Sequence, residues 1–363
     1  MLIHDIRLLH FRNYDDERVT FPPSIVVLHG KNGQGKTNLL EALYMASIGK
    51  SYRGLADADL IQWKQQTASL ILNFSRSGVI QQIKMILSKE AKKELWVNET
   101  RVSRRELIGT LNEVLFSPED LQLIKAGPAL RRRFLDRELS QVSPVYCQTL
   151  LRYHRAVAQR NLLLKRMKYE KVQSLEEWDR QIASLAADIV QRRLMALHKI
   201  RLLARITHKR LSGGEGMDID YVQPYGDGRE KDAQWYYDML QSHLEQDRYR
   251  MSTSVGPHRD DLEFSIAGAN LKKYGSQGQQ RTAVLALKLS ELEYMKSETG
   301  GEYPVLLLDD VMSELDSQRR QALLSFVKGR IQTFITTTEP DMFRSVADCS
   351  FICIEQGRVA ANG

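Results

Sequence analysis

The sequence predicts an α/β fold with a mixed sheet and helices, an antiparallel β subdomain and a short helical second lobe. Residues 25–28 and 304–308 are continuous apolar runs, as expected of strands covered on both faces. Apolar residues alternate with polar ones between residues 70 and 97, which predicts antiparallel strands with one covered face. From about residue 118 to 211, helical spacing and a near absence of glycine predict the helical lobe.

The predicted elements divide the chain into three segments. Residues 1–117 form the first part of an α/β head, 118–211 the helical lobe and 212–363 the second part of the head. Gly213 and Gly214 are expected to stop the last helix of the lobe. The lobe has no sustained heptads, which excludes a long coiled coil.

Composition favours a cytoplasmic protein with a polyanionic partner. The 363 residues are 42% hydrophobic and carry a net charge of +7, and no run of about eighteen apolar residues predicts a membrane span. The N-terminal residues do not resemble a secretory signal, and the three cysteines lack zinc-site spacing. Basic clusters gather in the helical region at Arg131-Arg132-Arg133, Lys165-Arg166, Arg192-Arg193, Lys199 and Arg201. A solvated basic helix face explains these clusters about as well as a binding surface does.

A phosphate-binding loop follows the first buried strand. Its residues are Gly30-Lys31-Asn32-Gly33-Gln34-Gly35-Lys36-Thr37, the pattern G-x-x-x-x-G-K-T. Glycines let backbone N–H groups converge on phosphate oxygens, and the helix predicted over residues 37–47 adds partial positive charge. Lys36 is expected to reach the β- and γ-phosphates of ATP, and the Thr37 hydroxyl to bind Mg²⁺.

Two carboxylates end the second buried strand. Asp309 is suited to bind Mg²⁺ opposite Thr37, and Asp310 could polarise the attacking water. We therefore expect Asp310 and Lys36 to serve catalysis.

A second anion-binding loop precedes the helix predicted from about residue 280 to 296. It contains Ser276, Gly278 and Gln279, in the pattern S-x-G-Q. One nucleotide needs only one phosphate cradle, so a second one suggests pairing of two chains. The order of phosphate loop, helical insert, S-x-G-Q signature and acidic strand is that of ABC-type ATPase heads.

Two departures from the usual ABC pattern predict slow hydrolysis. Asp316 matches the D-loop position, but Asp310 stands where many such ATPases have Glu. No histidine occurs at Thr336, Thr337 or Thr338, where most of them carry a switch histidine. A nucleotide-dependent switch fits these features better than a fast motor.

These residues, with several further motifs, resemble the RecF family of bacterial recombination mediators, which is related to Rad50 and SMC heads. The motifs are residues 9–14 (LHFRNY), 116–121 (FSPEDL), 131–136 (RRRFLD), 255–261 (VGPHRDD) and 307–316 (LLDDVMSELD). The short helical insert agrees, since Rad50 and SMC proteins extend that region into a long coiled coil.

The resemblance implies a weak, DNA-stimulated ATPase that forms a homodimer on ATP. It further implies binding to duplex DNA and single-strand junctions, cooperation with RecO and RecR, and RecA loading at gaps in repair, replication and the SOS response. It also suggests that Arg12 and Asn13 lie at the nucleotide edge, with a structural role equally open. For His258-Arg259-Asp260 it leaves structural support as the favoured role.

Two other functions compete with this one. A small-molecule P-loop kinase would have no use for the loop at Ser276. The ATPase subunit of a membrane transporter usually keeps the switch histidine and a shorter insert. Stimulation of ATP hydrolysis by DNA would separate these alternatives from the main hypothesis.

Overall fold

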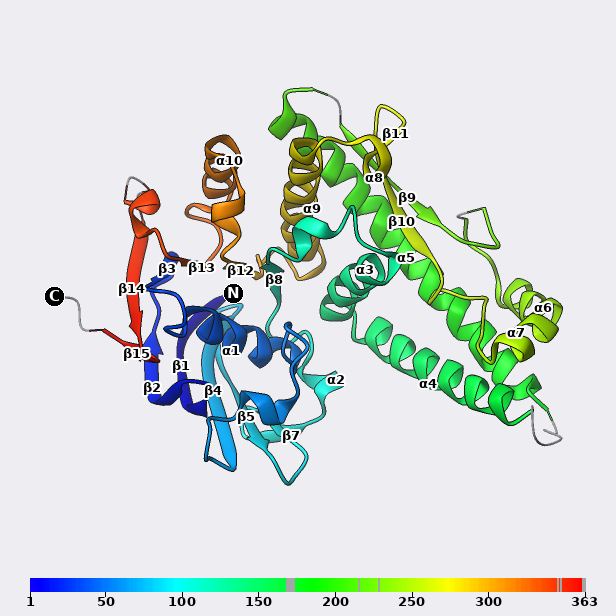
Figure 1. The fold of residues 1–363 in the computed structure, drawn as a ribbon, viewed down its shortest axis with the longest axis horizontal. Helices are drawn as coiled ribbons and strands as arrows, with labels where there is room; N and C mark the ends of the chain where they lie inside the picture. The colour runs from blue at the N-terminus through cyan, green and yellow to red at the C-terminus, as the bar shows by residue number, and fades with distance from the viewer. Residues whose placement is uncertain (168–173, 215, 228, 345, 347, 361–363) are drawn as a thin grey trace. The chain divides into compact units, whose positions relative to one another are not determined.

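The computed structural model describes residues 1–167, 174–214, 216–227, 229–344, 346 and 348–360, which form two compact units (Figure 1). The first unit consists of Met1–Leu121 and Lys288–Gly363, and the second of Gln122–Leu287. The chain therefore leaves the first unit once and returns to it.

The first unit contains two six-stranded sheets. Its strands are β1 (Leu2–Phe11), β2 (Tyr14–Thr20), β3 (Ile25–His29), β4 (Thr67–Arg76), β5 (Val79–Ser88), β6 (Glu94–Val97), β7 (Thr100–Val102), β8 (Glu113–Phe116), β12 (Val305–Asp309), β13 (Thr333–Thr337), β14 (Cys349–Glu355) and β15 (Arg358–Val359). Its helices are α1 (Lys36–Ile48), α2 (Arg104–Leu107) and α10 (Ser317–Val327), with 3₁₀ segments at Asp57–Leu60, Val311–Glu314 and Pro340–Phe343.

The two sheets differ in strand direction. One is antiparallel in the order β2-β1-β4-β5-β6-β7, and the other runs β15-β14-β3-β13-β12-β8, parallel except for the β14–β15 pair. Both the predicted mixed sheet and the predicted antiparallel subdomain are thus present. Because β3, β13 and β12 are parallel neighbours, their carboxyl ends meet at one edge, where open α/β sheets bind ligands.

The burial of side chains in the core of the first unit accounts for the apolar patterns of its strands and of helix α1. In β3 the residues from Ile25 to Leu28 are almost fully buried, as a strand covered on both faces requires. In β4, Leu70, Leu72 and Phe74 point into the core while their neighbours are half-buried. Helix α1 is buried nearly all round because it packs against strands of both sheets.

The second unit is built around long helices. Its elements are α3 (Pro128–Val142), α4 (Pro144–Arg166), α5 (Glu176–Ser212), β9 (Met217–Val222), α6 (Ala233–Ser242), α7 (Leu244–Arg250), β10 (Asp261–Ile266), β11 (Ala269–Asn270), α8 (Leu271–Tyr274) and the start of α9 (Gln277–Glu298). The strands form one antiparallel sheet in the order β11-β10-β9. Helix α5 ends where the sequence predicted, with Gly213 in the left-handed conformation at φ 65° and its N–H bonded to the Lys209 carbonyl.

The unit boundary differs from the predicted one. The segment after residue 212 was assigned to the head, yet β9 to α8 belong to the second unit. The reason is that β9 packs on α5 and pairs with β10, so the returning chain stays with the helices. The signature loop at Ser276 lies in this second unit. The elements without a counterpart in the sequence-based prediction include α2, β7, β8, β9, α6, α7, β11, α8, β14 and β15.

Among the described residues, we find no helix with the length and apolar character that crossing a bilayer requires.

A buried ion network ties three helices of the second unit together. Arg160 on α4 is fully buried, and its guanidinium donates to Asp179 on α5 at 2.5 Å and to Asp247 on α7 at 2.6 Å. It also donates to the Thr253 hydroxyl at 3.1 Å. Removing one partner from such a network leaves a charge buried without compensation.

We expect Arg160→Ala to lower the free energy of unfolding by about 3–5 kcal/mol, because Asp179 and Asp247 would stay buried without their cation. The matched control is Arg180→Ala on the same helix bundle, since Arg180 pairs with Glu176 at an exposed site and should change stability little. Urea unfolding of both variants measures the difference. Equal losses in the two variants would contradict the structural role of the network.

Candidate nucleotide site

The phosphate loop joins β3 to α1 at the carboxyl edge of the parallel sheet. Gly30, Gly33 and Gly35 have φ of 144°, 77° and 119°, which residues with side chains rarely adopt. A Cβ on Gly30 would also collide with the carbonyl oxygen of Ile354 on β14. The glycines of the motif are therefore required by the path of the backbone itself.

The Lys36 ammonium lies within this loop. It donates to the carbonyl oxygens of Gly30 at 2.7 Å and Lys31 at 2.9 Å, and the residue is 8% exposed. Burial lowers the pKa of Lys36, whereas the charges of Asp310 and Asp309 raise it. The Lys36 ammonium therefore lies within electrostatic range of Asp309 and Asp310, the two carboxylates that the sequence predicted to act in the same site.

The predicted metal ligands Thr37 and Asp309 are in contact. The Thr37 hydroxyl donates to Asp309 Oδ1 at 3.0 Å, and Thr336 on β13 donates to the same oxygen at 2.9 Å. Tyr52 donates its hydroxyl to Oδ2 at 2.6 Å. A hydroxyl and a carboxylate at the end of a phosphate loop are oxygen ligands of the kind that Mg²⁺ shares with nucleotide phosphates and water. These residues fit the ion.

Tyr52 and Thr336 are site residues that sequence reasoning missed. Burial and the neighbouring carboxylate of Asp309 raise the pKa of Tyr52, so its hydroxyl keeps the proton that it donates. No motif spacing marks Tyr52, which reaches the site from the loop after α1. Thr336 could have been noticed, because it is the penultimate residue of β13, beside β12, where a switch histidine was expected.

Asp310 has an unusual backbone for a residue that is not glycine. Its φ is 51°, and its N–H donates to the Thr336 hydroxyl at 2.9 Å. Partial burial of the carboxyl group, followed by the charge of Asp309, raises the pKa of Asp310, while Lys36 opposes the shift. Strained backbone and a raised carboxyl pKa are both features that concentrate at functional sites.

Arg12 and Asn13 lie beside the phosphate loop in the β1–β2 turn. Arg12 donates to the buried carboxylate of Glu41 at 3.3 Å. The side chain of Asn13 donates to the Gln34 carbonyl at 2.9 Å and accepts from Asn38 at 2.8 Å. Both side chains are thus engaged with the loop or with α1.

The signature loop of the second unit caps helix α9. The Ser276 hydroxyl accepts from the Gln279 N–H at 3.2 Å, and the Gln279 side chain accepts from the Ser276 N–H at 2.8 Å. This reciprocal capping box leaves both residues exposed, with Gly278 between them. Asp316 of the first unit caps another helix, α10, by accepting from the Arg319 N–H at 2.9 Å.

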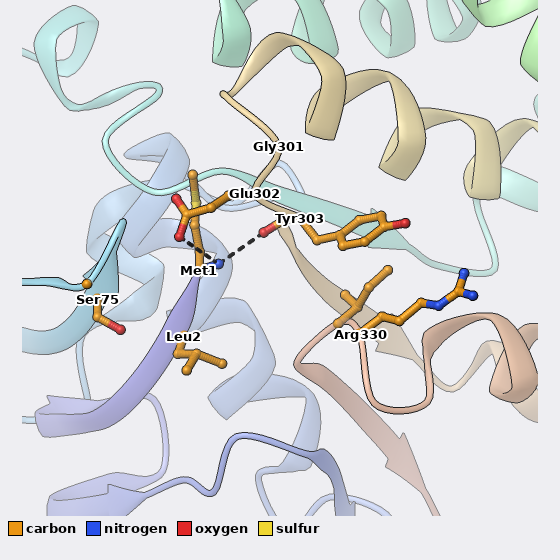
Figure 2. Close-up of a pocket in the computed structure, with 9 residues that line it drawn as sticks. Met1, Leu2, Ser75, Gly301, Glu302, Tyr303 and Arg330 are labelled. Carbon is orange, nitrogen blue, oxygen red and sulfur yellow. Dashed lines mark hydrogen bonds and ion pairs between the residues drawn. The ribbon is translucent and has the colours of Figure 1, made fainter.

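A separate cavity lies at the opposite edge of the sheet (Figure 2). It has a volume of about 410 Å³ and is lined by Met1, Glu302, Tyr303 and Arg330, near the amino ends of β12 and β13. The Met1 amino group contacts the Tyr303 carbonyl at 3.2 Å and Glu302 at 3.5 Å. The cavity contributes nothing to the phosphate loop, which follows the carboxyl end of β3.

The motif at residues 255–261 forms part of a buried network in the second unit. The His258 ring bonds to the Tyr153 hydroxyl and the Thr253 carbonyl, and burial lowers the pKa of His258 to about 4. Asp260 accepts from the Tyr221 hydroxyl at 2.7 Å, and burial raises the pKa of Asp260 to about 6. These contacts are those expected of structural support.

Two members of the basic clusters are also buried. Arg131 is 3% exposed and bonds to Asp261 through two guanidinium nitrogens, at 2.6 and 2.8 Å. Arg193 is 2% exposed and donates to Asp136, Tyr221 and the Pro257 carbonyl. Arg133, Lys165, Arg166 and Lys199 are the cluster members that are exposed.

Comparison with known proteins gives matches along nearly the whole chain. A family described as the RecF/RecN/SMC N terminal domain matches residues 2–360. The DNA replication and repair protein RecF of Alkaliphilus oremlandii is 41% identical, over 99% of this chain and 100% of the relative. The RecF protein of Halothermothrix orenii is 44% identical, over 93% of this chain and 92% of the relative.

Solved structures agree. The recombination mediator protein RecF, solved as RecF-ATP in the RecFOR pathway, is similar with a TM-score of 0.91 and 34% identity, covering 100% of this chain and 98% of that chain. An Smc head bound to the C-winged helix domain of ScpA is similar in fold, with a TM-score of 0.59 and 15% identity over 100% and 98%. The predicted α/β ATPase head fold is confirmed.

The raised pKa of Asp260 gives a stability test. Its carboxyl titrates near 3.8 when unfolded and at about 6 when folded, so ionisation opposes folding and stability is lost as the pH rises through this window. Asp260→Asn should gain about 2–3 kcal/mol relative to wild type between pH 4 and pH 7, since two pKa units correspond to about that free energy. Urea unfolding at several pH values measures this gain. A difference between the two proteins that stays flat across the window would contradict the prediction.

Proposed function

The chain belongs to the RecF/RecN/SMC family, and from this premise we propose that it is an ATP-dependent DNA-binding protein of recombinational DNA repair. The observation that carries the proposal is the contact between the phosphate loop and the acidic strand, with Thr37 bonded to Asp309. A second helix-capping loop of signature sequence on the same chain supports an ABC-type head. The RecF relatives supply the link to DNA repair.

Each residue of the site has a role in this proposal. The N–H groups of residues 30–37 cradle the ATP phosphates, and Lys36 neutralises the charge at the β- and γ-phosphates. Thr37 and Asp309 hold Mg²⁺, which when bound offsets phosphate charge. Asp310 accepts a proton from the attacking water, a role that its raised pKa supports. The short Asp side chain and the absence of histidine from positions 336–338 favour slow hydrolysis.

ATP binding drives dimerisation in the proposed cycle. Ser276, Gly278 and Gln279 present an exposed helix N-terminus that suits a γ-phosphate held by a second copy of the chain. Asp316 follows the acidic strand, at the D-loop position. In the proposed dimer, this loop lies near the composite nucleotide site. Hydrolysis then removes the γ-phosphate and lets the copies separate.

DNA is the proposed polyanionic partner. The net charge of +7 and the exposed Arg133, Lys165, Arg166 and Lys199 favour phosphate contacts without base reading. As the sequence resemblance to RecF implies, the chain recognises duplex DNA and single-strand junctions in the cytoplasm; the similar solved RecF acts in the RecFOR pathway. There it works with RecO and RecR to direct RecA loading.

We expect Asp310→Asn to bind ATP but to hydrolyse it at least about a hundredfold more slowly, because the water loses its base. The variant should remain on gapped DNA in the presence of ATP. Lys36→Ala should lose ATP-dependent DNA binding, because the phosphates lose their cation. Fluorescence anisotropy with gapped and blunt duplexes, with and without ATP, tests both variants. The proposed switch would be refuted if the affinity of the wild type for DNA were the same with and without ATP and did not change as the salt concentration rises.

Ser276→Arg is expected to leave ATP binding by the monomer unchanged and to abolish ATP-induced dimerisation. A bulky side chain would stand where a phosphate must approach the backbone N–H groups closely. Light scattering with ATP and Mg²⁺ measures the association of wild type, Ser276→Arg and Lys36→Ala. If Ser276→Arg dimerises as well as wild type, the composite site is wrong.

A further inference from the structure

The tip of the phosphate loop contacts two segments that are far away in the sequence. The Gln34 carbonyl accepts hydrogen bonds from the Gly357 N–H at 2.9 Å and from the Asn13 side chain at 2.9 Å. The Gln34 side chain accepts from the Gln356 N–H at 2.8 Å. The β1–β2 turn and the β14–β15 turn therefore hold the same residue of the loop.

Asn13 uses both ends of its side-chain amide. Its NH₂ group donates to Gln34, and its oxygen accepts from the Asn38 NH₂ group at 2.8 Å. Asn38 lies in the first turn of α1, whose N-terminus completes the phosphate cradle. One neutral side chain thus links the tip of the loop to the helix that follows it, which requires a donor and an acceptor together.

Two glycines allow these segments to approach. A Cβ on Gly35 would lie 2.8 Å from the Asn13 amide nitrogen, and one on Gly357 would overlap the Asn13 carbonyl oxygen. Gly357 has a φ of 75°, in the left-handed region. The close fit leaves no space for a side chain between the β14–β15 turn and Asn13.

We propose that Asn13 and the β14–β15 turn are positioning elements that hold the phosphate loop in its binding conformation before nucleotide arrives. This inference rests on the proposed ATP binding and deepens it. We call these contacts of Asn13 and the β14–β15 turn with the phosphate loop the lock. A loop whose N–H groups already converge loses less conformational freedom when it binds ATP, so the lock strengthens the affinity for ATP. The proposed metal ligand Asp309 and the proposed base Asp310 make none of these contacts, so turnover at saturating ATP should change little.

Gly357→Ala tests the lock, with Gly78→Ala as a matched control. Gly78 lies in the β4–β5 turn of the same unit at φ 77°, but a Cβ there would meet nothing within 4 Å. The two substitutions therefore introduce similar backbone strain, but only in Gly357→Ala would the added Cβ collide with Asn13. We expect Gly357→Ala to raise the Kd for ATP about tenfold or more, and Gly78→Ala to leave it within about twofold of wild type.

Asn13→Leu tests the amide directly, since it removes both hydrogen bonds without adding charge. Its Kd for ATP should also rise about tenfold, while kcat at saturating ATP stays within about twofold. Asn38→Leu should weaken binding in the same direction. The double variant should be no weaker than Asn13→Leu, because Asn38 acts through Asn13.

The measurements are equilibrium titration with ATP well below the melting temperature, and melting curves with and without ATP. A purely structural role would lower the melting temperature but leave the Kd unchanged, and this result would overturn the inference. If Gly357→Ala does not fold, Asn13→Leu decides the matter alone. Absence of ATP binding by the wild type would overturn the proposed function as well, whereas wild-type affinity in the variants overturns only the lock.

Discussion

The candidate nucleotide site depends on one carboxylate, that of Asp309, which is fixed from three directions. Thr37, Thr336 and Tyr52 each donate a hydroxyl to it, and they come from α1, β13 and the loop after α1. The arrangement is possible because β3, β13 and β12 are parallel neighbours whose carboxyl ends share one edge. Sheet order thereby brings together residues that are 272 positions apart in the chain.

The parts of the site that the sequence predicted are those governed by local constraints. The phosphate loop needs glycine at positive φ, and β12 needs an unbroken apolar run, so each leaves a readable pattern. Tyr52 and Glu41 belong to the site only through tertiary contacts, Tyr52 with Asp309 and Glu41 with Arg12. No motif or residue spacing in the sequence predicts these contacts. The head boundary was misplaced for the same reason, since the pairing of β9 with β10 joins residues on either side of two short helices.

Charge counted along the sequence is a poor guide to charge on the surface of the second unit. Arg131, Arg160 and Arg193 are among the most deeply buried side chains, each bonded to carboxylates within its own unit. They tie elements of the second unit together, as the half-buried His258 and the buried Asp260 hold the loop before β10. If the basic clusters contact DNA as proposed, they must do so through their exposed members, which are fewer than the sequence suggests.

The first unit is discontinuous in the chain, and this has a consequence for how the protein is made. During synthesis, the phosphate loop leaves the ribosome long before Asp309, Thr336 and Gly357, which complete its surroundings. The second unit, whose residues are continuous from Gln122 to Leu287, is fully synthesised in between. Its contacts close shorter loops and can form first, whereas the head must wait for its last strands. The candidate nucleotide site can therefore be completed only after β12, β13 and the β14–β15 turn have been synthesised.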